Sequence, residues 1–446
     1  MENPIQIAQQ ALFVLVLGAA GYLLFKRGSF IRRNILLGKE VEQPGDKGAR
    51  IRNTILIAFG QKKMFERPLA GIMHFTIYAG FLLINLEVLE IVLDGLLGTH
   101  RLFAGIFGDF YSFLINFFET IALLVVLACV AFLARRNIMR LPRFHKPEMK
   151  GWPTSDANII LIWEIVLMFA LYTMNATDSI LQSRGAEHYP VVGEFAISQS
   201  LIPLYQGLSN TVLIAVERTA WWMHIIGIMA FAVYITYSKH LHIFLAFPNT
   251  YFANLEAKGK MKNMDSVTNE VKLMMGLPAE EGNEEEEVGT FGAKDVQDLT
   301  WVNVLNAYSC TECGRCTSVC PANLTGKKLS PRKIMMDTRD RAEEIGKNID
   351  QHGEGHDDGK ALYGDYISKE ELMACTSCNA CVDACPINID PLSIILDMRR
   401  YVAMEESGTP MEWNAMFQNI ENNQAPWAFP PTDRFKWADE IKSVKS

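Results

Sequence analysis

Hydrophobic residues form long uninterrupted runs over the first half of the chain and become scattered after residue 247. A helix needs about 20 mainly apolar residues to cross a bilayer, and five runs reach that length. The runs lie at 5–25, 68–94, 108–134, 157–182 and 212–247. The pattern therefore predicts a mainly α-helical chain whose first part is a bundle of five membrane-spanning helices.

The distribution of Lys and Arg residues predicts how these spans are oriented. The loop 26–67 carries eleven of them and the loop 135–156 carries six, whereas the loops 95–107 and 183–211 carry one each. Short loops rich in Lys and Arg remain in the cytoplasm. We therefore expect a multi-pass protein of the cytoplasmic membrane, with its N-terminus outside and its C-terminal half in the cytoplasm. The first run has no basic start and no cleavage site, so we interpret it as a retained helix rather than a signal peptide.

The change from apolar to polar composition divides the chain. We expect a membrane domain at 1–247, a polar linker at 248–300, a cysteine-rich domain at 301–400 and a tail at 401–446. The formal net charge is −8, from 42 basic and 50 acidic residues. A mildly acidic chain of this kind gives no electrostatic reason to expect nucleic-acid binding.

Eight of the nine cysteines lie between residues 310 and 385, in two runs of the form C-x₂-C-x₂-C-x₃-C-P. This is the bacterial ferredoxin pattern, in which three close cysteines hold one [4Fe–4S] cluster and the fourth reaches the other cluster. The ligands predicted for the first cluster are Cys310, Cys313, Cys316 and Cys385. Those predicted for the second are Cys375, Cys378, Cys381 and Cys320.

The alternative for these cysteines is a pair of structural zinc sites, which use four ligands and often paired C-x₂-C motifs. Zinc does not require a third and a fourth cysteine followed by proline, repeated twice, so the spacing favours clusters. Between the two runs, Ser330 and Pro331 have the side chains expected at the N-cap and the first position of a helix. We therefore expect a helical two-cluster domain that is cytoplasmic, rather than a compact ferredoxin.

Ionisable residues inside the spans are functional candidates, because placing them in lipid is costly. His74 lies near the cytoplasmic end of the second span, and His240 and His242 lie near the same end of the fifth. Haem b with two axial imidazoles needs histidines at one depth on facing helices. We expect His74 and His242 to be these ligands. His242 follows His224 by 18 residues, or five helical turns, which places the two on one face, whereas His240 points away and is the weaker candidate.

His224 lies near the outer end of the fifth span, and no other histidine in a span lies opposite it. We therefore favour one haem b, although two remain open. His224 is then free to bind a quinone and exchange its proton, because imidazole titrates near neutral pH. Glu87 and Glu119 lie toward the same side and are further quinone or proton candidates. For each of these residues the alternative is a hydrogen bond to a neighbouring helix.

Taken together, these features resemble known families. The five spans with histidines on the second and fifth resemble the nitrate reductase gamma-type cytochrome b subunit, and the region from Cys310 to Cys385 resembles the C subunit of heterodisulfide reductase. The whole chain is similar to a fusion of the membrane cytochrome and ferredoxin subunits of heterodisulfide reductase-like complexes. Its tail, with Trp427, Arg434 and Trp437, is also similar to such proteins.

The resemblance implies partners. Such families exchange electrons with a heterodisulfide reductase B- or D-like subunit that carries CCG repeats, and we expect that subunit on a separate chain because no CCG pair occurs here. Fused relatives act as electron-transfer-flavoprotein:menaquinone oxidoreductases, which implies electron transfer flavoprotein as a further partner.

The predicted function is that of a quinone-linked oxidoreductase subunit embedded in lipid. It would connect a cytoplasmic redox partner to menaquinone or another quinone through two [4Fe–4S] clusters and haem b. One alternative is a haem-free membrane anchor for an iron–sulfur protein. Another is a redox-gated sensor or transporter, whose spans should contain broken helices or paired charges.

Overall fold

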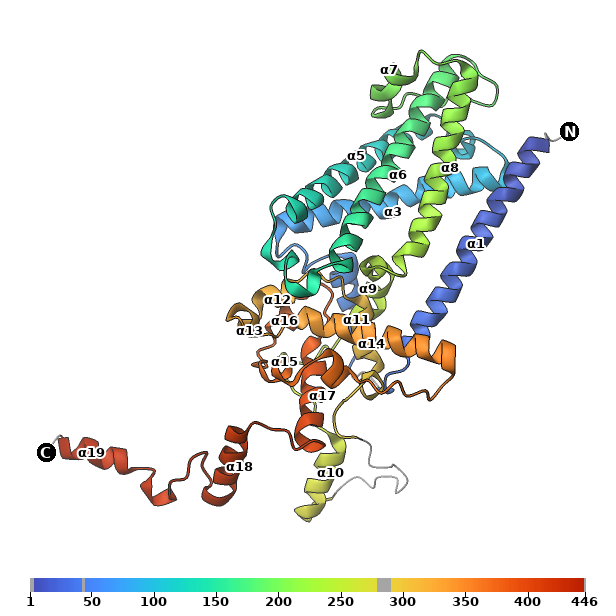
Figure 1. Ribbon diagram of the computed structural model, residues 1–446. Helices are drawn as coiled ribbons and strands as arrows, with labels where there is room; N and C mark the ends of the chain where they lie inside the picture. Colours follow the sequence, from blue (N-terminus) through green and yellow to red (C-terminus); the bar gives the residue numbers. More distant parts are fainter. Residues whose placement is uncertain (1–3, 42–44, 279–289, 445–446) are drawn as a thin grey trace.

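The computed structural model describes residues 4–41, 45–278 and 290–444, and this part of the chain folds into helices joined by loops. Five of its helices are long and apolar enough to cross a membrane. They are α1 (Pro4–Ile35), α3 (Pro68–Leu97), α5 (Asp109–Asn137), α6 (Trp152–Ser183) and α8 (Asn210–Ile235). The cysteine-containing residues form a second helical body at one end of this bundle (Figure 1). The predicted fold class is confirmed.

Short elements connect the bundle helices. They are α2 (Lys47–Thr54), η1 (Ile55–Phe59), α4 (Leu102–Phe107), η2 (Pro142–Phe144), η3 (Pro147–Met149), η4 (Ser198–Leu201) and α7 (Ile202–Tyr205). Proline begins α3 and lies in the first turn of α6, where its missing N–H costs no hydrogen bond.

The fifth predicted span, 212–247, is broken in the structure. α8 ends at Ile235, and the hydroxyl of Thr236 donates to the carbonyl of Val233 at 2.7 Å. The hydroxyl of Ser238 accepts a hydrogen bond from the backbone N–H of His240 at 3.0 Å. Hydroxyl side chains compete with helical hydrogen bonds in this way, and here they mark the end of α8 within the polar stretch 236–240.

Two short elements follow the break, the turn η5 (Lys239–Leu241) and the helix α9 (His242–Tyr251). His224 therefore lies on α8, whereas His242 begins a different helix. The prediction that these two histidines share one face of one continuous helix is wrong. The helical phase that favours His242 over His240 in a continuous span therefore does not apply.

The cysteine domain is built around α14 (Pro331–His352), which packs against α11 (Trp301–Ser309) and α17 (Pro391–Met404). The predicted start of α14 is confirmed, because the Ser330 hydroxyl accepts from the backbone N–H of Lys333 at 3.4 Å and Pro331 is the first helical residue. The smaller elements of this domain are η6 (Val296–Asp298), α12 (Arg315–Val319), α13 (Pro321–Leu324), η7 (Leu362–Tyr366), α15 (Lys369–Met373) and α16 (Ala380–Ala384).

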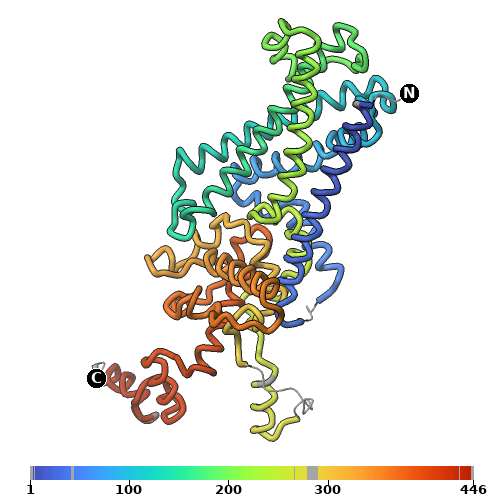
Figure 2. Tube along the Cα trace, turned by 45° about the vertical axis from the view of Figure 1, so that its right-hand side comes forward, coloured from blue at the N-terminus to red at the C-terminus, as the bar shows by residue number. Residues whose placement is uncertain are grey.

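The segment expected to be a linker, 248–300, contains more structure than its polarity suggested. It includes the end of α9 and the helix α10 (Asp265–Met274). Ala293, Val296 and Leu299 are buried in the core of the cysteine domain, so this domain begins before residue 301. In the tail, α18 (Met411–Asn423), η8 (Pro431–Asp433) and α19 (Lys436–Val444) extend away from the rest of the molecule (Figures 1 and 2).

Helix α1 extends beyond the bundle and docks on the cysteine domain. Arg27 forms a two-pronged ion pair with Glu343 of α14, with N–O distances of 2.7 and 3.0 Å. Farther along, a Cβ atom at Gly38 would lie only 2.6 Å from the backbone nitrogen of Trp301, so the two segments pack backbone to backbone. The extra length of α1 over the predicted 5–25 therefore joins the two parts of the molecule.

We predict that Glu343→Gln weakens this junction by roughly 1.5–3 kcal/mol, the usual contribution of hydrogen bonds to a charged group. Both side chains of the Arg27–Glu343 pair are largely shielded, at 11% and 16% exposure. The measurement is thermal unfolding of the detergent-solubilised protein, with limited proteolysis at the junction. Asp350→Asn is the matched control, because Asp350 also lies on α14 and pairs with α1 through Arg33, but is 51% exposed. Equal effects of the two substitutions would contradict the assigned role of the Arg27 pair.

Candidate metal centres

The two cysteine runs adopt the same backbone path. The second residue after the first cysteine, Glu312 or Ser377, has a positive φ of 54° in both runs. The residue after the second cysteine, Gly314 or Asn379, also has a positive φ and begins a five-residue helix, α12 or α16. These two helices pack against each other. The repeat in the sequence is therefore a repeat in structure, with each run wrapped around its own three cysteines.

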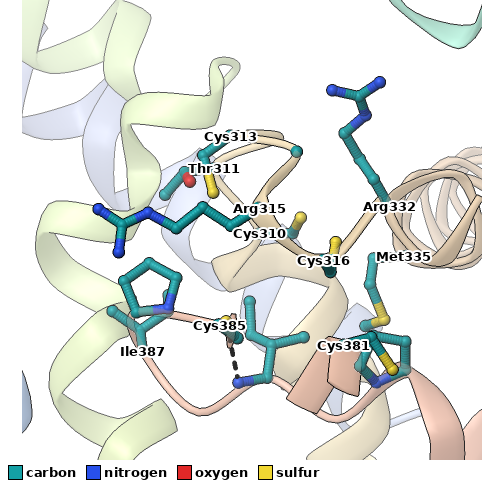
Figure 3. Close-up of a pocket in the computed structure, with 14 residues that line it drawn as sticks. Cys310, Thr311, Cys313, Arg315, Cys316, Arg332, Met335, Cys381, Cys385 and Ile387 are labelled. Atoms are coloured by element: carbon teal, nitrogen blue, oxygen red, sulfur yellow. Dashed lines mark hydrogen bonds between the residues drawn. The ribbon is translucent and has the colours of Figure 1, made fainter. Parts of the chain in front are cut away.

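Cysteines of the two runs lie close to one another in the structure. Cys310, Cys313, Cys316 and Cys385 line one pocket, together with Cys381, and Figure 3 shows their side chains around this shared space. Cys375 has Cys320 and Cys378 as its electrostatic neighbours, and Cys381 has Cys375 and Cys320. We call these groups set 1 (Cys310, Cys313, Cys316, Cys385) and set 2 (Cys375, Cys378, Cys381, Cys320). None of these eight cysteines forms a disulfide bond.

The surroundings of set 1 suit metal-bound thiolates. Burial raises the pKa of Cys310 to about 12 and that of Cys385 to about 11, so these thiols become thiolates only when a strong positive charge is bound. The backbone N–H of Ile389 donates to the Cys385 sulfur at 3.3 Å (Figure 3). In set 2 the N–H of Ser377 donates to the Cys375 sulfur at 3.4 Å. Such N–H···S bonds are typical of iron–sulfur ligation, where they tune the reduction potential.

The two sets differ in position. Cys378 of set 2 is exposed, whereas Cys310 and Cys385 of set 1 are buried. Set 1 faces the bundle, because the guanidinium of Arg315 donates to the carbonyl of Lys63 at 2.8 Å. The Lys63 ammonium in turn donates to the carbonyl of Cys385 at 3.0 Å. The loop that leads into α3 is therefore held directly against the first cysteine loop.

Two of the predicted haem ligands meet at this same junction. The ring centres of His74 on α3 and His242 at the start of α9 lie 6.3 Å apart. Two imidazoles on opposite sides of one metal, each bonded at about 2 Å, have ring centres about 6 Å apart. Within the described part of the chain, the buried Nδ1 of His74 has no hydrogen-bond partner. His242 Nδ1 lies 3.1 Å from the Lys239 carbonyl, the kind of contact that orients metal-bound histidines. The residues present therefore fit a haem with two axial histidines.

The other two histidines occupy different positions. The His240 ring lies 5.3 Å from that of His242 and 5.8 Å from Phe231, beside the pair rather than across from it. His224 is fully buried on α8, and its Nδ1 lies 2.9 Å from the carbonyl of Leu167 on α6. His224 is thus held by a helix–helix hydrogen bond, apart from the other three histidines.

The far end of the bundle contains a buried network of charges centred on Arg101. The Arg101 side chain contacts Asp178 at 2.9 Å and the Asn175 side-chain oxygen at 2.7 Å. Glu119 accepts hydrogen bonds from Asn175 at 3.0 Å and from the backbone N–H of Ile197 at 2.8 Å. This makes Glu119 an anchor for the loop that contains η4.

Glu87 differs from the other carboxylates in this network. It is 3% exposed, its Oε1 accepts no hydrogen bond from the residues that the structure describes, and the nearest Arg101 nitrogen is 4.0 Å away. The predicted quinone candidates Glu87 and Glu119 therefore share one network, whereas His224 lies outside it. Arg101 and Asp178 are not among the residues predicted from the sequence. The sequence signal that could have indicated this network is Arg101 itself, the single basic residue of the loop 95–107.

Comparison with known proteins supports the cluster interpretation. Residues 309–389 match the family of 4Fe-4S dicluster domains. The chain is 27% identical to the "Probable iron-sulfur-binding oxidoreductase FadF" of Bacillus subtilis (strain 168), over 98% of this chain and 62% of the relative. It is 25% identical to the "EtfAB:quinone oxidoreductase" of Syntrophomonas wolfei, over 96% of this chain and 59% of the relative. The chain thus spans about 60% of the length of these two curated relatives.

A further similarity covers the cysteine domain alone. Over 102 residues, or 23% of this chain and 49% of the relative, the chain is 33% identical to the C subunit of the ferredoxin/F(420)H(2)-dependent CoB-CoM heterodisulfide reductase of Methanosarcina acetivorans. No solved structure matches the chain. Together the relatives indicate an iron–sulfur electron-transfer protein of the oxidoreductase type. The predicted likeness to heterodisulfide reductase C is confirmed, and the likeness to the nitrate reductase cytochrome stays a prediction.

We predict that Cys385→Ser and Cys316→Ser perturb the same cluster, because both cysteines belong to set 1 although they come from different runs. The wild-type protein should contain about eight iron and eight sulfide per chain, as two [4Fe–4S] clusters require. Electron paramagnetic resonance of the reduced protein should show one signal altered in both variants and a second signal altered in Cys320→Ser. Cys129→Ser, at the buried ninth cysteine, is the control. Zinc without sulfide, or separate signals altered by the two set 1 variants, would contradict the assignment.

We also predict that His74→Leu and His242→Leu each abolish haem binding, because each removes one of the two imidazoles that face each other. His224→Leu and His240→Leu should retain haem. The measurement is haem b per chain in the purified protein, with one expected for the wild type. A content of two haems, or full haem content in His74→Leu, would show that the pairing of His74 with His242 is incomplete or incorrect.

Proposed function

We propose that this chain is the membrane subunit of a quinone-linked oxidoreductase, in which two [4Fe–4S] clusters and haem b connect a soluble redox partner to quinone. One observation carries the proposal. The loops of set 1 lie against the loop that leads into α3, the helix of His74, through the contacts of Arg315 and Lys63. Glu312 of the first run also pairs with Lys239, three residues before His242. The clusters and the haem, when bound, accept and release single electrons.

The arrangement of the cysteines supports an order for this transfer. Cys378 gives set 2 an exposed edge, where a soluble partner has access. Arg315, which lies between Cys313 and Cys316 of set 1, is within electrostatic range of His74. We therefore propose that electrons pass from set 2, which the exposed Cys378 makes accessible, through set 1 to the pair formed by His74 and His242.

Electrostatics around set 1 supports the same function. Arg143 and Arg315 are both charge neighbours of Cys313, and the side chain of Arg332 lines the set 1 pocket. Thiolate-bound clusters carry net negative charge, which increases on reduction. Nearby guanidinium groups stabilise the more negative state, because opposite charges attract most strongly in a site shielded from water. These arginines therefore favour acceptance of an electron at set 1.

Quinone chemistry requires protons as well as electrons, and we assign the proton exchange to Glu87. Of the carboxylates around Arg101, Glu119 already accepts several hydrogen bonds, whereas Glu87 has a buried oxygen that accepts none from the described residues. A buried carboxyl group of this kind inside a bundle is a candidate for a proton relay. His224, held by Leu167, is the second candidate and lies outside the Arg101 network.

The partners follow from the same proposal. A subunit or segment with CCG repeats, and electron transfer flavoprotein, are the proposed redox partners at the exposed edge of set 2. The second relative is named as an oxidoreductase between EtfAB and quinone. The Lys and Arg content of the loops favours a cytoplasmic position for this edge and an outer position for the Arg101 network.

We predict that Glu87→Gln slows oxidation of the reduced protein by a water-soluble quinone analogue by on the order of 100-fold, the usual contribution of a positioned proton donor. The measurement is the reoxidation rate of haem after anaerobic reduction. His224→Ala tests the second candidate in the same assay. Glu164→Gln, a glutamate on α6 outside the Arg101 network, is the control. If Glu87→Gln and His224→Ala both react with quinone at the wild-type rate, the quinone site lies elsewhere. If wild-type haem is not oxidised by quinone, the proposed function itself fails.

A further inference from the structure

The side chain of Lys239 bridges the bundle and the first cysteine loop. It forms an ion pair with Glu312, which lies between Cys310 and Cys313. It also donates to the carbonyl of Pro153 at 2.5 Å, at the start of α6. The Lys239 side chain is 10% exposed and that of Glu312 is 3% exposed. The pair is therefore shielded from water, and ion pairs are stronger in such shielded sites than in water.

Both partners are themselves fixed. Glu312 forms a second ion pair with Arg339 of α14 at 2.9 Å. The backbone of Glu312 has the positive φ found at the same position of both cysteine loops. The backbone N–H of Lys239 donates to Asp156 of α6 at 3.1 Å. Neither end of the bridge is free to move independently.

The main chain of Lys239 completes the connection. Its carbonyl lies 3.1 Å from Nδ1 of His242, so one residue contacts the cysteine loop through its side chain and the imidazole through its backbone. A direct path from Cys310 to His242 thus runs through Glu312 and Lys239. Two other ion pairs of the junction, Arg27–Glu343 and Arg33–Asp350, involve neither a cysteine loop nor a histidine.

We propose that Lys239 is a positioning residue that sets the distance and orientation between the set 1 cysteine loop and the His242 imidazole. The inference rests on the proposed function, since it concerns electron transfer between a cluster at set 1 and a haem held by His74 and His242. A ligating histidine is oriented by the carbonyl that accepts its second N–H, and loss of such support typically costs about 10–100-fold in affinity or activity. Here the carbonyl belongs to Lys239, whose side chain also pairs with Glu312 in the first cysteine loop.

The test compares Lys239→Met with Glu312→Gln. Methionine matches the length of the apolar stem and removes the terminal ammonium group, and glutamine keeps the shape of Glu312. Each variant should shift the g-values of the oxidised low-spin haem, which report the imidazole planes, and should slow reduction of haem by the clusters about tenfold. The double variant should show the same g-values and the same rate of haem reduction as either single variant, because each of the three variants removes the same Lys239–Glu312 bridge.

Glu343→Gln is the matched control, since it removes a shielded glutamate from another ion pair of the same junction. It should leave the haem g-values and the rate of haem reduction unchanged. Unaltered g-values and rates in Lys239→Met and Glu312→Gln would overturn the proposal, as would additive effects of the two substitutions. If Lys239→Met does not fold, Glu312→Gln decides alone, because it leaves the backbone of Lys239 unchanged. A wild-type protein without haem b would instead refute the proposed function.

Discussion

The contact between the bundle and the cysteine domain is the constraint on which the rest of the structure depends. Cations from both sides bind backbone carbonyls and carboxylates of the other, and Arg315 and Arg332 are those of the cysteine domain. Lys63 binds the Cys385 carbonyl, Lys239 pairs with Glu312, and Arg27 pairs with Glu343. These basic residues seat the cysteine domain against the loop that leads into α3 and against the turn η5 that precedes α9. In the proposed topology, the Lys and Arg residues of the same loops also favour a cytoplasmic position.

This docking determines where a redox path can run. Set 1 contacts the bundle loops through Arg315 and Cys385, whereas set 2 contains the exposed Cys378, so we propose that soluble partners reach set 2 first. Because α8 breaks after Ile235, the chain turns back and brings His242 to within 6.3 Å of His74, measured between ring centres. The break after α8 thus places the His242 imidazole at the junction. At the other end of the bundle, Arg101 lies beside carboxylates of two helices, Glu87 of α3 and Asp178 of α6, and the Oε1 atom of Glu87 accepts no hydrogen bond from the described residues.

The cysteine motifs and the long apolar helices could be predicted from the sequence because each depends on a local pattern of residues. Ligand spacing in each run and the length of each span are set by residues close together in the chain, as is the cap at Ser330. The break between α8 and α9 was not predicted, because the segment after it, 241–247, is again largely apolar and the hydroxyl bonds of Thr236 and Ser238 leave no periodic signal in the sequence. The Arg101 network and the Lys239–Glu312 bridge could not be predicted from the sequence for a different reason. Each joins residues far apart in the chain, and a single Lys or Arg carries no sign of a distant partner.

The central claim is that electrons pass within this chain from the clusters to a haem held at the junction. Its most direct test is rapid mixing of the anaerobic, oxidised protein with a soluble low-potential reductant, with the cluster absorbance and the haem α-band followed together. The account predicts that the clusters are reduced first and that the haem follows at a rate that falls sharply in Cys385→Ser. A haem that is reduced at the same rate with or without an intact set 1 cluster, or the absence of any b-type α-band, would contradict it.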